Sequence, residues 1–182
     1  MMNYESLLNE ACDNGLIIKE KALKYNNGLI KGNKIAIRKD IETSIEKACV
    51  LAEELGHHYT TVGNIIDLTD AQNRKQERQA RLWAYNKQIG LTGIIRTFEA
   101  GCQNIHEMAE YLEVTEEFLH EAIECYRNKY GIYTTLDNYI IYFIPHLTIA
   151  ERINWYNRYG VIYKVGYLWC KLKRKRGNSY GI

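Results

Sequence analysis

Residues 51–58 of this 182-residue chain read LAEELGHH, a stretch that places two kinds of metal-binding side chain at helical spacing. On a helix, Glu53 and His57 lie one turn apart on the same face. Glu54 lies about 60° around the helix from His57. The stretch therefore predicts one helix face that carries a carboxylate, an imidazole and a neighbouring second carboxylate.

This spacing is that of the HExxH zinc helix, whose outer two residues bind the metal and whose inner glutamate activates water. Glu53 replaces the first histidine. Because a carboxylate is also a zinc ligand, the replacement changes such a site without necessarily abolishing it. A tetrahedral catalytic site needs a third protein ligand. Glu77 is the candidate, since Ala80 and Ala84 follow it on one small-residue stripe and would let its helix approach the metal helix closely.

Two other interpretations of the stretch stay open. His58 is an alternative ligand because it follows Glu54 by four residues. If Glu54 and His58 were the ligands, however, no glutamate would occupy the inner position that activates water. His58 is therefore expected beside the metal ligands or the substrate. A chance pair on a helix, with His57 as a surface or capping histidine, is the simplest alternative. The remaining three histidines lack metal-ligand spacing and are expected to be solvated or core residues: His106, His120 and His146.

The rest of the chain predicts an α+β fold dominated by helices, since it has a single proline and long stretches of helical periodicity. The helix that carries residues 51–58 begins at Thr43, because Glu46 follows at the spacing of a capping box. Residues 34–38 alternate like a strand with one buried face. The other expected elements are helices at 4–12, 17–25, 71–89, 92–100, 104–112 and 115–129, and one or two strands within 132–144.

Composition excludes several classes of protein. Hydrophobic residues make up 46% of the chain and charged residues 25%, which is typical of a globular protein and not of a disordered one. The longest apolar run, at 139–145, is too short to span a bilayer, and the first residues lack the layout of a signal peptide. Five cysteines without a CxxC pair predict neither a disulfide framework nor a thiolate zinc site. We expect a reduced, cytoplasmic protein.

Residues 105–122 have the apolar spacing of a helix-turn-helix motif. Residues 104–125, however, contain seven glutamates and no lysine or arginine. Phosphate contacts need cations, so no direct contact with nucleic acid is expected, and the segment is interpreted as a helical packing module. Its acidic surface could instead receive a basic partner protein. The basic run at 171–176 is expected to be a solubilising tail, with membrane-surface or nucleic-acid contact as the alternative.

Three segments together resemble the ImmA/IrrE family of metallo-endopeptidases. They are 28–37 (GLIKGNKIAI), 48–58, and the Glu77-x-x-Ala80-x-x-x-Ala84 pattern, and the resemblance spans about residues 5–145. Members are gluzincin-like proteases of bacteria, prophages and mobile elements that cleave helix-turn-helix repressors. The resemblance implies a small sheet packed on a zincin-type metal helix. The chain as a whole is expected to have three parts: a metallopeptidase-like domain at 1–90, a helical module at 91–131, and C-terminal strands with a basic tail at 132–182, of which the resemblance does not cover the tail.

The resemblance further implies roles for four residues. Glu53, His57 and Glu77 would bind the metal, and Glu54 would be the general base. The expected metal is Zn²⁺, with Mn²⁺ or Fe²⁺ as alternatives because oxygen ligands dominate the set. Two carboxylate ligands neutralise the charge of the ion, so the bound water should be less acidic than at a histidine-rich site.

Two functions follow from the resemblance. The first is an endopeptidase that cleaves a helix-turn-helix repressor of a prophage or mobile element, with the substrate added as a strand to a sheet edge. The strand at 34–38 would place that edge beside Glu54. The second is a non-catalytic protein that uses the same fold to bind and sequester the repressor. A DNA-binding regulator is the least favoured alternative.

Overall fold

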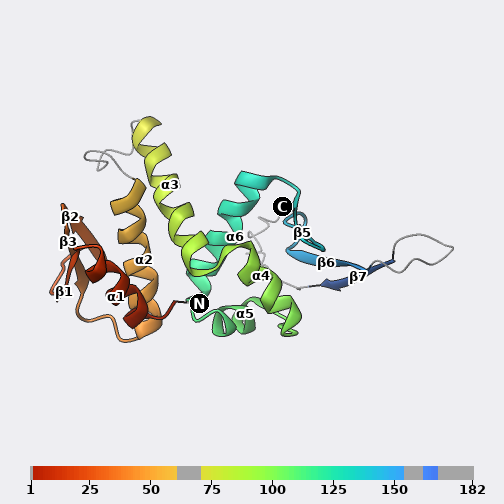
Figure 1. Ribbon diagram of the computed structural model, residues 1–182, viewed down its shortest axis with the longest axis horizontal. Coiled ribbons are helices and arrows are strands. Elements are labelled where there is room, and N and C mark those ends of the chain that lie inside the picture. Colours follow the sequence, from red (N-terminus) through yellow and green to blue (C-terminus); the bar gives the residue numbers. More distant parts are fainter. Residues whose placement is uncertain (1, 61–70, 154–161, 168–182) are drawn as a thin grey trace, which may run out of the picture.

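The computed structural model describes residues 2–60, 71–153 and 162–167, which form six helices and seven strands. The helix-dominated α+β class expected from the sequence is confirmed. Two small sheets lie at opposite ends of the long axis, and the helices lie between them (Figure 1). The basic run at 171–176 lies outside the described residues. Among those described, no helix is long and apolar enough to cross a bilayer.

The N-terminal sheet has the order β1-β3-β2 and packs against α1 (Tyr4–Asp13) and α2 (Ser44–Thr60). Its strands are β1 (Ile17–Lys21), β2 (Gly28–Lys31) and β3 (Lys34–Arg38). The central strand β3 buries Ile35 and Ile37, and it pairs in parallel with β1 and antiparallel with β2. The small sheet expected on the metal helix is therefore present.

Two expectations about this sheet are wrong. The helix expected at 17–25 is replaced by β1, because the backbone of 17–21 pairs in register with 34–38. That non-local ladder overrides a weak local amphipathic pattern. The strand at 34–38 exists, but it is central and has no free edge. The edge nearest α2 belongs to β2 instead.

Helices α2 and α3 (Ala71–Gln88) form the most closely packed pair of helices in the described structure. Ala80 and Ala84 are fully buried where α3 meets α2. At Gly56 of α2, an added Cβ atom would collide with the backbone carbonyl of Ala80. The close approach expected from the two alanines is confirmed, and it depends equally on a glycine of the facing helix.

The helical segment expected after the metal helices consists of α4 (Gly90–Glu99), α5 (Ile105–Tyr111) and α6 (Glu116–Tyr130). Asn104 caps α5 and Thr115 caps α6, each through a side-chain oxygen that accepts a backbone N–H. The apolar residues of this segment join the same core as α2 and α3: Met108, Leu112, Val114, Phe118, Leu119 and Ala122.

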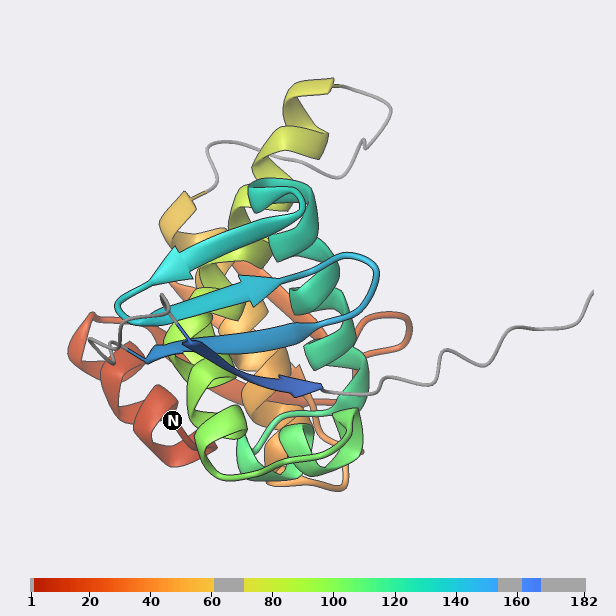
Figure 2. The ribbon, with the colours of Figure 1, turned by 90° about the vertical axis from the view of Figure 1, so that its right-hand side faces the viewer.

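The C-terminal sheet is a meander of four antiparallel strands in the order β4-β5-β6-β7. Figure 2 shows these strands side by side in front of the helices. Ile141, Phe143 and Ile149 are buried on the side that joins the core. The strands are β4 (Tyr133–Leu136), β5 (Tyr139–Tyr142), β6 (Thr148–Ile153) and β7 (Ile162–Tyr167).

Candidate metal centre

His57 and Glu77 are brought together by the packing of α2 against α3. His57 Nε2 lies 3.5 Å from Glu77 Oε2. Nitrogen and oxygen ligands bind zinc at about 2.0–2.2 Å, so two ligands on one tetrahedral ion lie about 3.4 Å apart. The pair therefore has the spacing of two donors to one metal ion.

The protonation state of His57 also suits metal binding. Burial lowers the pKa of His57, and the charge of Arg81 lowers it further, against the opposing effect of Glu77. The imidazole is therefore neutral at pH 7, which is the form that binds metals.

Glu53 lies one turn before His57, but its carboxylate does not join the other two. Within residues 2–60, 71–153 and 162–167, no three His, Cys, Asp or Glu side chains form a group that could bind a metal ion. Glu53 instead lines a cavity of about 390 Å³ together with Arg81, Glu117 and Glu121. Burial raises the pKa of Glu53 to about 7, and its acidic neighbours add to this effect while Arg81 opposes it.

Arg81 is the residue of this site that the sequence interpretation missed. Its Nε donates to Glu77 Oε1 at 2.8 Å, and its Nη1 donates to Glu121 Oε2 at 3.2 Å. The hydroxyl of Tyr85 donates to the same Glu121 oxygen at 2.8 Å. Only the first contact has a sequence signal, since residues 77 and 81 are an i,i+4 ion pair. The contact with Glu121 crosses from α3 to α6 and has none.

Glu54 lies against the N-terminal sheet. An added Cβ atom at Gly28 of β2 would come within 2.5 Å of Glu54 Oε1 and 2.8 Å of a Val50 methyl group. The side chain of Glu54 therefore packs directly against the backbone of an edge strand. Burial raises the pKa of Glu54 to about 7, and the carboxylates of Glu53 and Glu77 raise it further.

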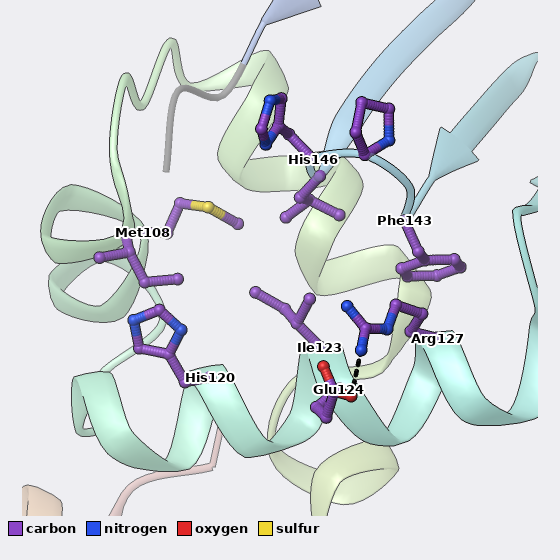
Figure 3. A pocket seen from close by; sticks show the side chains of 10 residues that line it. Met108, His120, Ile123, Glu124, Arg127, Phe143 and His146 are labelled. Carbon is purple, nitrogen blue, oxygen red and sulfur yellow. Dashed lines mark hydrogen bonds and ion pairs between the residues drawn. The ribbon is translucent and has the colours of Figure 1, made fainter. Parts of the chain in front are cut away.

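The other histidines lie outside this cluster. His58 packs edge-on against Tyr59, with ring centroids 5.0 Å apart. His106 Nδ1 lies 2.8 Å from Glu116 Oε1 at the surface. His120 on α6 and His146 after β5 lie on opposite sides of a separate, largely apolar pocket of about 100 Å³ (Figure 3). Met108 and Phe143 line the same pocket, which contains no cluster of metal donors.

Comparison with known proteins identifies the family. No curated protein and no solved structure matches the chain significantly. The IrrE N-terminal-like domain of the M78 peptidases does match, over residues 17–124, which is more than half of the chain. This match supports a metallopeptidase-type function with a metal cofactor and a protein substrate, and it confirms the resemblance of the three sequence segments. The chain therefore belongs to the IrrE N-terminal-like family of metallopeptidases.

Proposed function

We propose that this protein is a cytoplasmic, zinc-dependent endopeptidase that cleaves a helix-turn-helix repressor of a prophage or mobile element. The observation that carries the proposal is the position of Glu54. This carboxylate lies against the edge strand β2, and it is also within Coulombic reach of Glu77, a member of the metal-donor pair. A polypeptide added to that edge would run past both.

The side chains fit a metal ion best at the His57–Glu77 pair, because the two donor atoms have the spacing of ligands on one ion. Glu53, on the same face of α2, is the proposed third ligand. Zn²⁺ is the proposed metal, with Mn²⁺ or Fe²⁺ as alternatives. When bound, the ion would supply Lewis-acid polarisation of the scissile carbonyl and acidification of water.

The protein's own residues account for substrate binding and proton transfer. Among the described strands β2 lies at the edge of its sheet, and the backbone N–H and C=O groups of an edge strand can bind a substrate in extended conformation, with little preference for its side chains. In the proposed mechanism, the Glu54 carboxylate takes a proton from the attacking water while the water oxygen bonds to the scissile carbon. Glu54 then gives that proton to the amide nitrogen as the C–N bond breaks.

The repressor is proposed as substrate on grounds of charge. The N-terminal turn of α6 exposes Glu116 and Glu117, and Glu117 also lines the cavity beside Glu53. An acidic surface beside the cleavage site favours a partner with a basic face, and a DNA-binding protein has one.

A second function, sequestration of the repressor without cleavage, is favoured by one observation. The three proposed ligands do not converge within the described residues, and Glu77 is already paired with the cation of Arg81. A protein with this arrangement could bind a substrate strand on β2 without hydrolysing it.

Cleavage and sequestration are distinguished by incubating the purified protein with the repressor encoded beside its gene. We expect the wild type to contain metal and to produce discrete fragments, and Glu54→Gln to retain the metal without producing fragments. Glu42→Gln, an exposed change just before α2, is the matched control and should cleave like the wild type. A stable complex without fragments from the wild type would support sequestration. Absence of both metal and complex formation would refute both functions.

A further inference from the structure

We propose that a groove between α3 and α6 is a docking site for an acidic amphipathic helix of a partner protein. The groove has a volume of about 760 Å³ and lies where α3 and α6 run side by side (Figure 1). It adjoins the cavity beside Glu53, because Arg81 and Glu121 line both. The inference concerns binding alone and requires neither a metal ion nor cleavage, so it goes beyond the proposed function.

The groove has the length of a short helix. The residues of α3 that line it extend from Lys75 to Tyr85, and those of α6 extend from His120 to Lys129. At about 1.5 Å per residue, each wall is roughly 14–15 Å long, which corresponds to between two and three helical turns. A groove of this length between two helices can receive the apolar face of an amphipathic helix.

The floor of the groove is largely apolar. Leu82 of α3 and Cys125 of α6 line it, and both side chains are half-buried and packed against the core. The ring of Tyr85 is buried beside them, and its hydroxyl donates to Glu121. Because that hydroxyl already has a partner, an apolar side chain can cover the floor without leaving it unsatisfied. The floor therefore fits the apolar stripe of a helix.

The rim of the groove is basic on both sides. Lys75 and Arg78 on α3 and Lys129 on α6 are exposed, and none of the three forms an ion pair with another described residue. A helix with its apolar stripe on the floor would place the residues that flank the stripe against these cations, so acidic flanks are complementary. Phosphates could pair with the rim but would leave the apolar floor uncovered, so a protein helix fits better than a nucleic acid.

The two glutamates of the groove do not cancel this charge. Glu121 accepts a hydrogen bond from Arg81 at 3.2 Å, and Glu124 accepts one from Arg127 at 2.6 Å. Each carboxylate therefore already has a cationic partner. The N-terminal turn of α6 is acidic, whereas the groove beside its C-terminal half has a basic rim. The two parts of α6 thus favour partners of opposite charge.

The test measures the binding of a labelled probe peptide to the full chain by fluorescence anisotropy. The probe is an amphipathic helix of about four turns with leucines on one face and glutamates on both flanks. We expect saturable binding that weakens as the salt concentration rises. Lys75→Glu and Lys129→Glu together, one on each wall, should raise the dissociation constant about tenfold, because two ion pairs are replaced by like-charge contacts.

Lys24→Glu and Lys39→Glu together are the matched control. Both lysines are exposed and lie outside the groove, and the change in net charge is the same. This variant should bind nearly as tightly as the wild type. A second probe has the same composition, but its leucines are dispersed around the helix. It should bind about tenfold more weakly, because it cannot cover the floor with apolar side chains.

Equal binding of the two probes would show that the groove only attracts anions, and the proposal would be wrong. It would also be wrong if the wild type bound neither probe. An unchanged dissociation constant for Lys75→Glu with Lys129→Glu, in a variant whose folding circular dichroism verifies, would likewise overturn it. Sedimentation of the unliganded chain as a dimer that the same two substitutions dissociate would assign the groove to a second copy of the chain instead.

Discussion

The helix pairs α2–α3 and α5–α6 each have the residue spacing of a well-known functional motif, yet they are built differently. In α2–α3 the backbones approach so closely that Gly56 has no room for a Cβ atom. Polar side chains of α2 lie beside that interface, with Glu53 in a cavity that Arg81 of α3 also lines and Glu54 against β2, and burial raises the pKa of both carboxyl groups. In α5–α6 the interface is apolar and most of the glutamates are exposed or half-exposed. A functional motif is thus recognised by the polar groups that its packing forces together, rather than by helical spacing alone.

The exception to this contrast is Glu121, which belongs to α6 but contacts Arg81 of α3. The two pairs are therefore not independent parts of the molecule. Phe118 packs edge-on against Tyr85 one turn away, with ring centroids 4.9 Å apart. Through α6, the α5–α6 pair therefore supports α3, the helix that carries Glu77.

The largest expected effect on stability tests whether α6 is integral to the core. Phe118→Ala removes a buried aromatic ring that joins α6 to α3, and we expect it to lower the free energy of unfolding by about 3–5 kcal/mol. Urea denaturation measures this change. Ile123→Ala, a partly buried change on the same helix, should cost less. A loss below about 1 kcal/mol for Phe118→Ala would mean that α6 contributes little to the stability of the core.

An intermediate effect is expected where α2 meets α3. Gly56→Ala places a Cβ atom against the carbonyl of Ala80, so the helices must separate, and we expect a net loss of about 2 kcal/mol in unfolding free energy. Gly93→Ala is the matched control, because it is also helical and its new Cβ would meet side-chain atoms rather than backbone, Leu112 Cδ2 at 3.2 Å and Ile89 Cγ2 at 3.6 Å. There, the helix propensity of alanine should make the change neutral or stabilising by up to about 1 kcal/mol. Equal losses at the two positions would contradict the backbone contact.

The smallest expected effect on stability concerns the N-terminal caps of α2 and α6. Thr43 accepts the N–H of Glu46 at the start of α2, and Thr115 accepts the N–H of Phe118 at the start of α6, both at 3.1 Å. Replacing either threonine with alanine should cost about 1 kcal/mol, measured by thermal or urea unfolding. Similar costs would show that the two helices have equivalent caps and differ only in their interfaces. A loss of stability for only one of the two substitutions would show that the two caps are not equivalent.

Local patterns account for what could be predicted from the sequence. The Thr43–Glu46 spacing predicted the start of α2, and the alanines after Glu77 predicted a close helix pair, because both depend on residues within two turns. The strand β1 could not be predicted, because its pairing with residues 34–38 decides its conformation. The Arg81–Glu121 contact joins residues 40 positions apart, and neither residue belongs to a motif that predicts the other. The positions of the four proposed site residues depend on both kinds of information.

The position of β2 at the edge of the described sheet has a consequence for the protein on its own. An edge strand that can accept a substrate can also accept a second copy of the same chain, which is a route to aggregation. This edge is only four residues long, Gly28–Lys31, and Lys31 places a charge at its end. A short edge with a terminal lysine disfavours extended pairing between copies, while the absence of a side chain at Gly28 lets Glu54 pack against the backbone of the same strand. The shortness of this strand and its terminal lysine therefore disfavour self-association at the edge proposed to bind substrate.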